Sequence, residues 1–418
     1  MSMVQEITAM ARQVKDASRV LATMGTTEKD HALRLMAAGL RERRAFLQEQ
    51  NRLDLTAARQ QGLSPAMIDR LTLSDGVIEA MAVGLEEVAA FADPVGEVTR
   101  MWKRPNGLLV GKMRIPLGVI GMIYESRPNV TADAAGLCLK AGNGVILRGG
   151  SEAIHSNLAI LKVLHDALAA TSIPREVIQV IPLTDRQAIT EMLKLEDCID
   201  LVIPRGGEGL IRFVVEHSRI PVIKHYKGVC HVFVDQDADL VMAREIVINA
   251  KTHRPGVCNA LETLLVHRDI APAFLPLIVD ALRRAHVEVR GCEQARVLVP
   301  DLVAATEEDW HAEYLSLILA VRVVDDLDRA VEHINRYGSD HTETIVTSSY
   351  ERSQEFLQRV NSSVVMVNAS TRFSDGGQMG LGAEIGISTT KLHAYGPMGL
   401  EGLTTTKYII YGNGQIRQ

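Results

Sequence analysis

The sequence predicts an α/β protein with two parallel-sheet domains and a smaller β arm. Three observations point to this class. Short β-prone runs alternate with helical runs from residue 119 onward, the same alternation returns after residue 239, and an alternating segment near residue 100 contains a strong turn signal. Buried strands that are separated by helices of about 10–15 residues predict right-handed βαβ units, and such units form parallel sheets.

Length and composition fit this class and exclude others. A chain of 418 residues is too long for one ordinary core, so two or three domains are expected. The net charge of −6 provides no basic field for nucleic acid or an anionic membrane. The chain has no run of about 18 apolar residues, and residues 1–15 lack the apolar core of a secretory signal. We therefore expect a cytoplasmic protein without nucleic-acid or membrane partners.

The five cysteines are widely spaced. They stand at Cys138, Cys198, Cys230, Cys258 and Cys292. Their number is odd, and no C-x-x-C pair or paired Cys/His spacing occurs, so neither a disulfide framework nor a metal site is expected. Free thiols at this density suit a reducing compartment such as the cytoplasm.

The first hundred residues are predicted to be helical. Apolar residues recur at three- and four-residue spacing over Ala9–Met24, His31–Leu53 and Leu73–Ala92. The basic run 41–44 contains an acidic residue and lies in a helical pattern, so we expect a solvated helix face there rather than a ligand site.

A hairpin is predicted next. Residues 98–104 alternate, the turn residues Pro105-Asn106-Gly107 follow, and residues 108–115 are β-prone. The tail 403–412 is also β-prone and is expected to pair with this hairpin. Residues 97–118 and 403–418 would then form an arm.

The two α/β stretches follow in turn. In the first, the expected strands are Val119–Tyr124, Val145–Leu147, Val177–Ile181, Ile199–Ile203, Pro221–Lys224 and His231–Val234, and the expected helices are Ala132–Lys140, Glu152–Ala170, Asp185–Leu195 and Gly209–His217. In the second, the expected strands are Glu262–Val266, Glu343–Val346 and Val364–Val367, and the expected helices are Asp239–Ala250, Ala271–Ala285, Asp328–Ile334 and Tyr350–Val360. The domains should therefore be 1–96 with 119–228, and 229–402.

Two glycine turns are candidate nucleotide sites, although no strict G-x-G-x-x-G or phosphate-loop motif occurs. Arg148-Gly149-Gly150 and Arg205-Gly206-Gly207 each stand between a predicted strand and a helix. Small residues at the carboxyl end of a parallel strand let a ligand approach the backbone, and the helix N-terminus attracts phosphate. Ordinary glycine turns would give the same pattern, so both interpretations remain open.

Cys258 differs from the other cysteines. Cys138, Cys198 and Cys230 lie in or beside apolar helices and strands and are expected to be structural, while Cys292 has no assignment. Cys258 lies in a polar turn after Pro255-Gly256, between a helix and a strand. Two cationic neighbours, His253 and Arg254, favour a reactive thiolate at such a place, although a structural thiol is the alternative.

Two polar segments complete the candidates. The segment 224–228 is predicted to end a strand and contains His225, which would be either catalytic or structural. The segment 368–376 follows a predicted strand. In it, Arg372 with Asn368 and Ser370 would suit an anionic, amino-acid-like substrate. An Asx-rich loop without a ligand is the alternative for this second segment.

Taken together these segments resemble the aldehyde dehydrogenase superfamily, and within it the branch that reduces γ-glutamyl phosphate. The resemblance extends over nearly all 418 residues. Its most specific strings are residues 121–131, 139–144, 203–207, 224–228, 368–376 and 380–388. It implies two Rossmann-like parallel-sheet domains of aldehyde dehydrogenase type plus a β oligomerisation arm, with residues 1–96 and 119–228 as the NADP-binding domain and 229–402 as the catalytic domain.

The resemblance also assigns roles to residues. It implies that Cys258 is the nucleophile and that Glu313 binds a cofactor ribose. The family's cofactor lysine matches Arg148, beside Gly149, where a cation would hold the 2′-phosphate of NADPH. The small-residue cofactor turn of the family matches Arg205-Gly206-Gly207.

Two departures from the family pattern affect the expected chemistry. The family's general-base glutamate, which activates water to hydrolyse the thioester, aligns with His225. Its absence favours acyl-phosphate reduction over oxidation to a free acid. The family's oxyanion asparagine aligns with Ser126, so Ser126, Asn129 and the Cys258 backbone N–H are candidate oxyanion donors.

The resemblance therefore implies NADPH-dependent reduction of L-glutamyl 5-phosphate to L-glutamate 5-semialdehyde through a Cys258 thioester, in proline biosynthesis. Asn368, Ser370 and Arg372 would bind the substrate's α-carboxylate and amine. A homo-oligomer is expected, and direct transfer from a glutamate 5-kinase is left open. The rivals are an aldehyde dehydrogenase that makes a free acid and a catalytically silent nucleotide-binding scaffold.

Overall fold

The computed structural model describes residues 2–417, which form two compact units. Unit 1 contains residues 2–224, 380–386 and 398–417, and unit 2 contains residues 225–379 and 387–397. The sequence predicted a continuous second domain over 229–402, whereas residues 380–386 and 398–402 pack with unit 1. Phe91 explains part of this placement, since its ring lies so close to Gly382 that a Cβ there would be only 2.4 Å away.

The centre of unit 1 is a four-stranded parallel sheet in the order β5-β4-β3-β6. The strands and the helices that follow them are β3 (Val119–Tyr124), α6 (Val130–Lys140), β4 (Gly144–Arg148), α7 (Ile154–Leu168), β5 (Ile178–Val180), α8 (Gln187–Met192), β6 (Leu201–Arg205) and α9 (Glu208–His217). The predicted βαβ alternation is confirmed. The predicted strand Pro221–Lys224 is wrong, because only a single bridge joins Val222 to Val202.

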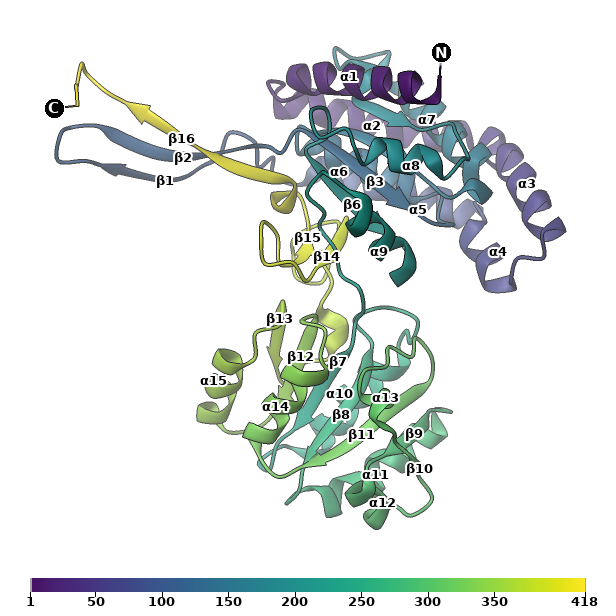
Figure 1. The fold of residues 1–418 in the computed structure, drawn as a ribbon, viewed down its shortest axis with the longest axis vertical. Helices are drawn as coiled ribbons and strands as arrows, with labels where there is room; N and C mark the ends of the chain where they lie inside the picture. Colours follow the sequence, from purple (N-terminus) through teal and green to yellow (C-terminus); the bar gives the residue numbers. More distant parts are fainter. Residues whose placement is uncertain (1, 418) are drawn as a thin grey trace. The chain divides into compact units, whose positions relative to one another are not determined.

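Helices from the N-terminal region pack around this sheet (Figure 1). They are α1 (Met3–Leu21), α2 (Thr26–Glu42), α3 (Arg44–Gln60), α4 (Pro65–Leu71) and α5 (Asp75–Ala90). Helix α1 packs directly on the strands, and the others pack on α6, α7 and one another. The helix predicted over His31–Leu53 is in fact two helices, because Arg43 leaves helical geometry with φ −94° and ψ 17°. The basic run 41–44 lies on a largely exposed helix face as expected, and there the Arg41 guanidinium bonds Glu79 and Glu86 of α5.

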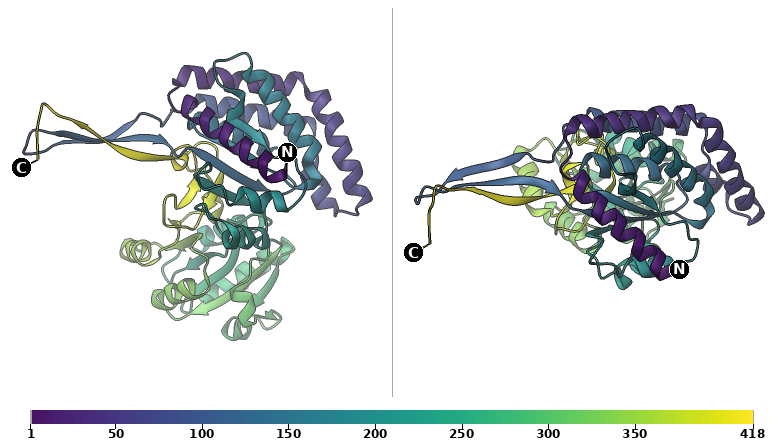
Figure 2. Two further views of the ribbon diagram at one scale, coloured as in Figure 1. Left: turned by 45° about the horizontal axis from the view of Figure 1, so that its top comes forward. Right: turned by 90° about the horizontal axis from the view of Figure 1, so that it is seen from above.

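The predicted hairpin and its pairing with the tail are confirmed. Strands β1 (Val98–Lys103), β2 (Leu109–Pro116) and β16 (Thr404–Tyr411) form an antiparallel sheet in the order β1-β2-β16. Gly107 closes the hairpin with φ +89°, a backbone conformation that glycine adopts without strain. Figure 2 shows these three strands extending from the helices and strands of unit 1.

Unit 2 contains a seven-stranded parallel sheet in the order β10-β9-β11-β8-β7-β12-β13. Its elements are β7 (Cys230–Val234), α10 (Leu240–Thr252), β8 (Leu261–His267), α11 (Ala271–Arg284), β9 (Glu288–Gly291), α12 (Glu293–Leu298), β10 (Val303–Ala304), α13 (Glu307–Trp310), β11 (Ile318–Val324), α14 (Leu327–Tyr337), β12 (Thr342–Val346), α15 (Tyr350–Arg359) and β13 (Val364–Val367). Helices α10, α11 and α12 pack on one face of the sheet, and α14 and α15 pack on the other. The strand and helix prediction from periodicity did not include β9, β10 and β11.

The remaining short elements lie in connections. They are β14 (Gly386–Ser388), β15 (Gly396–Met398) and the 3-10 turns η1 (Ser151–Ala153), η2 (Arg175–Val177), η3 (Thr371–Phe373) and η4 (Glu401–Leu403). Among residues 2–417, no helix is long and apolar enough to cross a lipid bilayer.

Candidate active site

Cys258 lies in the turn between α10 and β8, at the amino end of the unit 2 sheet. The turn is closed by a 3.1 Å hydrogen bond from the backbone N–H of Ala260 to the carbonyl of Val257. The thiol is half-buried. The position agrees with the turn that the sequence predicts, and a partly exposed thiol on a connection is suited to react with a small molecule.

Positive charge lies beside this turn. Burial and the neighbouring Arg254 lower the pKa of Arg372, whereas the charges of Asp375, Cys258 and Cys230 act to raise it. Arg372 also donates from Nε to Nδ1 of His253 at 3.4 Å. Since a cation close to a thiol stabilises its thiolate, this surrounding favours Cys258 as a nucleophile.

Gly228 makes the closest backbone approach to Cys258. A Cβ at Gly228 would lie 2.0 Å from the carbonyl oxygen of Cys258, so only glycine fits. The N–H of Gly228 donates to Oε1 of Glu313 at 2.9 Å. The backbone at residue 228 thus brings two residues predicted to be functional, Cys258 and Glu313, to one place in unit 2.

The thiol of Cys230 contacts the same carbonyl. Its Sγ lies 3.2 Å from the Cys258 oxygen, and burial raises the pKa of Cys230 well above the ordinary value. Cys230 is therefore an inert packing group. The segment 224–228 was expected to end a strand, but it leads into β7 instead, so residues 225–228 reach Cys258 from the amino end of the sheet.

Replacing Gly228 with alanine should lower kcat by about 100-fold or more, because the Cys258 backbone must move and a misplacement of about 1 Å can have that effect. Gly256→Ala is the matched control. It lies in the same turn as Cys258, and a Cβ there would meet only an ordinary contact at 3.8 Å. Steady-state kinetics on both variants, with circular dichroism to show that each is folded, would test this. Equal activity of the two variants would contradict the interpretation.

A buried ion pair supports the segment around Glu313. Lys251 donates to Oε2 of Glu262 at 2.6 Å and to the carbonyl of Leu261 at 2.8 Å, and both charged side chains are fully buried. The other oxygen of Glu262 accepts the N–H of Leu315 at 3.2 Å. One indication of the Lys251–Glu262 pair was visible in the sequence, because the charged Glu262 stands near the start of the mostly apolar strand β8. No role was predicted for either residue.

The predicted substrate loop is held mainly by its own side chains. The Asn368 amide accepts from the N–H of Thr347 and donates to the carbonyl of Thr347, both at 2.9 Å. Ser370 is buried, and its Oγ accepts the N–H of Arg372 at 3.4 Å. Asn368 and Ser370 therefore stabilise the loop, and their role as direct ligands stays a prediction. The half-buried Arg372 has parallel N–H donors suited to a carboxylate.

The predicted cofactor turn lies where the unit 1 sheet reverses its winding. The chain runs from β3 outward to β5 and then returns to β6 on the other side of β3. Ligands bind at such a point, outside the carboxyl ends of the strands. Arg205 ends β6, and Gly207 precedes α9.

The geometry of this turn fits a cofactor phosphate. Among the residues that the structure describes, and apart from the two chain neighbours of Gly207, no heavy atom lies within 4 Å of a Cβ built there. The N–H of Gly207 donates to Oε2 of Glu125 at 3.1 Å. This carboxylate occupies the place that a phosphate oxygen would take at a helix N-terminus. The sequence analysis did not single out Glu125, although it lies within the specific string 121–131.

Both side chains proposed as oxyanion donors have carboxylate partners within unit 1. The N–H and Oγ of Ser126 donate to Oε1 of Glu152 at 2.8 and 2.6 Å. Asn129 donates from Nδ2 to Asp133 at 3.0 Å. Ser126 thus uses its hydroxyl on Glu152 in this structure, whereas the Asn129 amide has a second N–H to donate. Ser126, Asn129 and the backbone N–H of Cys258 stay the predicted oxyanion donors.

Arg148 is buried at the end of β4. Its guanidinium donates to the carbonyls of Gly149 and Thr184 at 2.7 and 3.0 Å, and its Nε has no partner in residues 2–417. Burial lowers the pKa of Arg148. Gly149 itself is required for packing, because a Cβ there would lie 2.1 Å from the amide of Asn157.

Comparisons with known proteins identify the family of this chain. The profile described as "Aldehyde dehydrogenase family" matches residues 2–300. The gamma-glutamyl phosphate reductases of Geotalea daltonii and Geobacter metallireducens are each 63% identical over 418 residues, which is 100% of this chain and of theirs.

Solved structures also share the fold. The crystal structure of gamma-glutamyl phosphate reductase from Thermotoga maritima has a TM-score of 0.97 at 49% identity, covering 99% of this chain and 100% of that one. An acetylating aldehyde dehydrogenase from Geobacillus thermoglucosidasius has a TM-score of 0.71 at 18% identity, with 100% and 98% covered. The predicted fold class is confirmed. The chain belongs to the aldehyde dehydrogenase family of oxidoreductases, which use a nicotinamide cofactor, and groups there with the gamma-glutamyl phosphate reductases.

Proposed function

We propose that this protein reduces L-glutamyl 5-phosphate to L-glutamate 5-semialdehyde and phosphate, with NADPH as the reductant, in proline biosynthesis. The observation that carries the proposal is the half-buried Cys258 thiol beside Arg254 and Arg372, in a chain 63% identical over its full length to relatives named gamma-glutamyl phosphate reductase.

Cys258 performs the covalent steps. Its thiolate attacks the γ-carbonyl carbon, a C–S bond forms, and the C–O bond to phosphate breaks. NADPH, when bound, supplies the hydride that reduces the thioester. The resulting thiohemiacetal collapses, the C–S bond breaks, and the thiolate is restored as the aldehyde leaves. The Cys258 backbone N–H stabilises the oxyanion in both steps.

His225 replaces the family's hydrolytic base in this proposal. Its ring lies 5.8 Å from that of His341 in an edge-to-face contact, and burial lowers the pKa of His341 to about 3. His341 therefore stays neutral at pH 7. Without a carboxylate base at position 225, water is not activated and the thioester persists until reduction.

Arg372 binds the α-carboxylate of the substrate, because its guanidinium lies beside the nucleophile's turn and offers parallel N–H donors. The cofactor is assigned to Arg205-Gly206-Gly207 for the phosphates, Glu313 for a ribose, and Arg148 for the 2′-phosphate of NADPH. Close packing requires glycine at both turns, because a Cβ at Gly149 would lie 2.1 Å from the Asn157 amide and one at Gly206 would lie 2.7 Å from the Glu125 carboxylate.

The test of this function is the reverse reaction. With glutamate 5-semialdehyde and NADP, NADPH formation followed by its absorbance should depend on added phosphate, and mass spectrometry should detect no free glutamate. NADP reduction without phosphate, with glutamate as product, would instead identify a hydrolysing aldehyde dehydrogenase. The absence of any reaction would identify a catalytically silent nucleotide-binding scaffold.

The Arg148→Gln variant should lose kcat/KM with NADPH by about 10–100-fold, which is the effect of one hydrogen bond to a charged group. With NADH, which lacks the 2′-phosphate, kcat/KM should change much less. Arg175→Gln, an exposed change in the same unit, is the control. An equal loss with both cofactors would show that Arg148 only supports the fold through Gly149 and Thr184.

We propose further that the β arm joins copies of this chain into a homo-oligomer. Strand β16 is the outer strand of its sheet, and it exposes Tyr408, Ile410 and Tyr411. An uncovered edge with apolar side chains pairs readily with a second strand. The five free cysteines suit a cytoplasmic location.

A further inference from the structure

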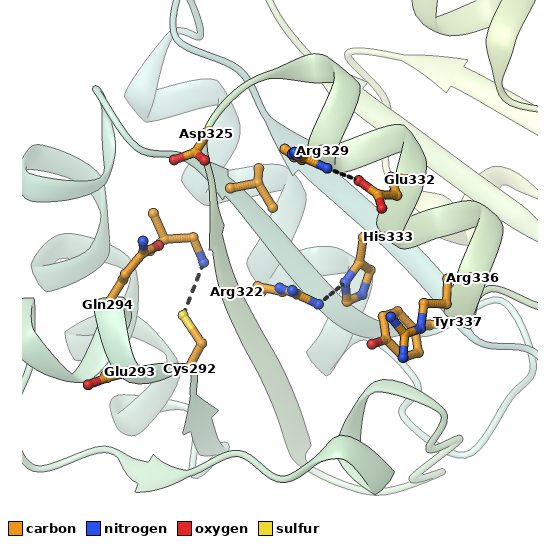
Figure 3. A pocket seen from close by; sticks show the side chains of 12 residues that line it. Cys292, Glu293, Gln294, Arg322, Asp325, Arg329, Glu332, His333, Arg336 and Tyr337 are labelled. Atoms are coloured by element: carbon orange, nitrogen blue, oxygen red, sulfur yellow. Dashed lines mark hydrogen bonds and ion pairs between the residues drawn. The ribbon is translucent and has the colours of Figure 1, made fainter.

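Unit 2 contains a cavity of about 440 Å³ that includes none of the residues of the candidate active site (Figure 3). It lies between the start of α12 and helix α14. Its floor is formed by residues 322–325 at the end of β11, with Cys292 just beyond β9. These are the carboxyl ends of two neighbouring parallel strands. Cys258 precedes β8, so it lies at the amino edge of the same sheet.

The cavity stands at a point where the sheet reverses its winding. From β9 the chain passes through α12 to β10 at the outer edge, whereas from β11 it passes through α14 to β12, beyond β8 and β7. Right-handed crossovers in opposite directions place the two helices on opposite faces, and the two separate hydrophobic cores agree with this. A crevice opens between such helices, and open α/β sheets bind ligands there.

Arg322 contributes the cationic group on the floor of this crevice, a guanidinium. Its Nη1 donates to Nδ1 of His333 at 2.9 Å, and its guanidinium lies 5.5 Å from the Trp310 ring and 5.9 Å from the Tyr337 ring. Burial lowers the pKa of His333 to about 2, so this partner is neutral. Within residues 2–417 no carboxylate lies within ion-pair distance of Arg322. A half-buried guanidinium with aromatic and neutral neighbours keeps a positive charge that an anion can satisfy.

The other two arginines of the cavity are already neutralised. Arg329 pairs with Glu332, and Arg336 pairs with Glu307 at 3.1 Å. Both pairs are exposed, so each contributes little to stability. The lining also contains the carboxylates of Glu293 and Asp325, of which Asp325 pairs with Arg268 at 3.5 Å. Among the three arginines of the lining, Arg322 is the one without a carboxylate partner in residues 2–417.

We propose that this cavity binds a small organic or inorganic anion, with a carboxylate or phosphate group on Arg322. The site is separate from Cys258 and does not depend on the proposed function. Cys292 lies at its side, where Sγ accepts the N–H groups of Val323 at 3.3 Å and Ala295 at 3.5 Å. A bound anion would thus cover both Arg322 and the Cys292 thiol.

Tryptophan fluorescence provides a direct test, because the chain has two tryptophans, Trp102 and Trp310. In the full chain with Trp102→Phe, titration with inorganic phosphate and, separately, with glutarate at constant ionic strength should change Trp310 emission in a saturable manner. Adding Arg322→Gln should abolish the saturation, whereas adding Arg284→Gln, which alters an exposed surface pair, should preserve it. A saturable response to only one anion identifies which group the site prefers.

Alkylation of Cys292 keeps the proposal testable if the Arg322 variant does not fold. In the unaltered chain, an anion at about ten times its dissociation constant should slow iodoacetamide labelling of Cys292 about tenfold, because only about a tenth of the sites stay empty. Mass spectrometry of each cysteine peptide separates this effect from labelling of Cys258. No saturable fluorescence change, the same saturation in Arg322→Gln, or unchanged Cys292 labelling would each overturn the proposal.

Discussion

The Cys258→Ala variant is expected to lose acyl-phosphate reduction by about 10⁴-fold or more in kcat, since removal of a covalent nucleophile leaves only binding and oxyanion stabilisation. The fold should persist, because the side chain is small and half-buried in a turn. Initial rates of NADPH oxidation with L-glutamyl 5-phosphate would measure the loss. Iodoacetamide at neutral pH should label Cys258 in the parent protein before the buried thiols, as expected for a thiolate beside Arg254 and Arg372.

Cys198→Ala is the matched control for this experiment. Cys198 is a buried thiol of unit 1, and the same chemical change there should leave kcat within a few-fold of the parent value. If Cys258→Ala retained more than a hundredth of the activity while Cys198→Ala behaved as expected, the thioester mechanism would have to be abandoned.

The Lys251→Met variant is expected to lose about 3–5 kcal/mol of unfolding free energy, because it leaves the buried Glu262 carboxylate without its cation. Urea denaturation would measure this. Arg284→Met breaks an exposed pair with Asp280 and should change stability by less than about 1 kcal/mol. Adding Glu262→Gln to Lys251→Met should recover about half of the loss, since the amide side chain keeps an acceptor for the N–H of Leu315 but carries no charge.

The pH dependence of unfolding provides a second test, because the direction in which the stability deficit of Lys251→Met changes with pH can be predicted. Burial raises the pKa of Glu262 from 4.5 to about 7 even with Lys251 present. The folded state then binds a proton that the unfolded state releases, so this group's contribution to stability falls as pH rises from about 4.5 through 7. Without Lys251 the pKa rises further. Below about pH 6 Glu262 is protonated in both folded proteins, so the deficit of Lys251→Met should grow as pH rises through about 7 and above. A deficit independent of pH would show that lost packing, not charge, dominates.

The sequence correctly predicted those structural features that depend only on residues close together along the chain. The strand and helix alternation after residue 119 and the turn at Gly107 depend on periodicity and on backbone preferences over a few residues. Local pattern failed at Arg43, which interrupts a helix although neither glycine nor proline marks the place. There, packing of two helices against other elements outweighs intrinsic propensity.

In the candidate active site, too, the sequence predicted local features but not contacts between distant segments. The sequence placed Cys258 on a polar turn between α10 and β8, because Pro255-Gly256 and the flanking apolar runs define that turn. The sequence could not show that the Asn368 amide is hydrogen-bonded to the Thr347 backbone, or that Ser126 donates to Glu152. Each partner comes from another segment of the chain. Residue type indicates what a side chain can bond, whereas packing decides what it does bond.

The sequence by itself therefore determined the α/β class, the hairpin with its paired tail, and the place of the Cys258 thiol on a polar turn. Only the tertiary structure decided that Gly228 lies against the Cys258 carbonyl and holds Glu313, which is 85 residues away along the chain. It also decided that β9 and β11 are neighbours whose helices diverge around Arg322. Strand order and close packing set these contacts, and neither follows from propensities that act over a few residues.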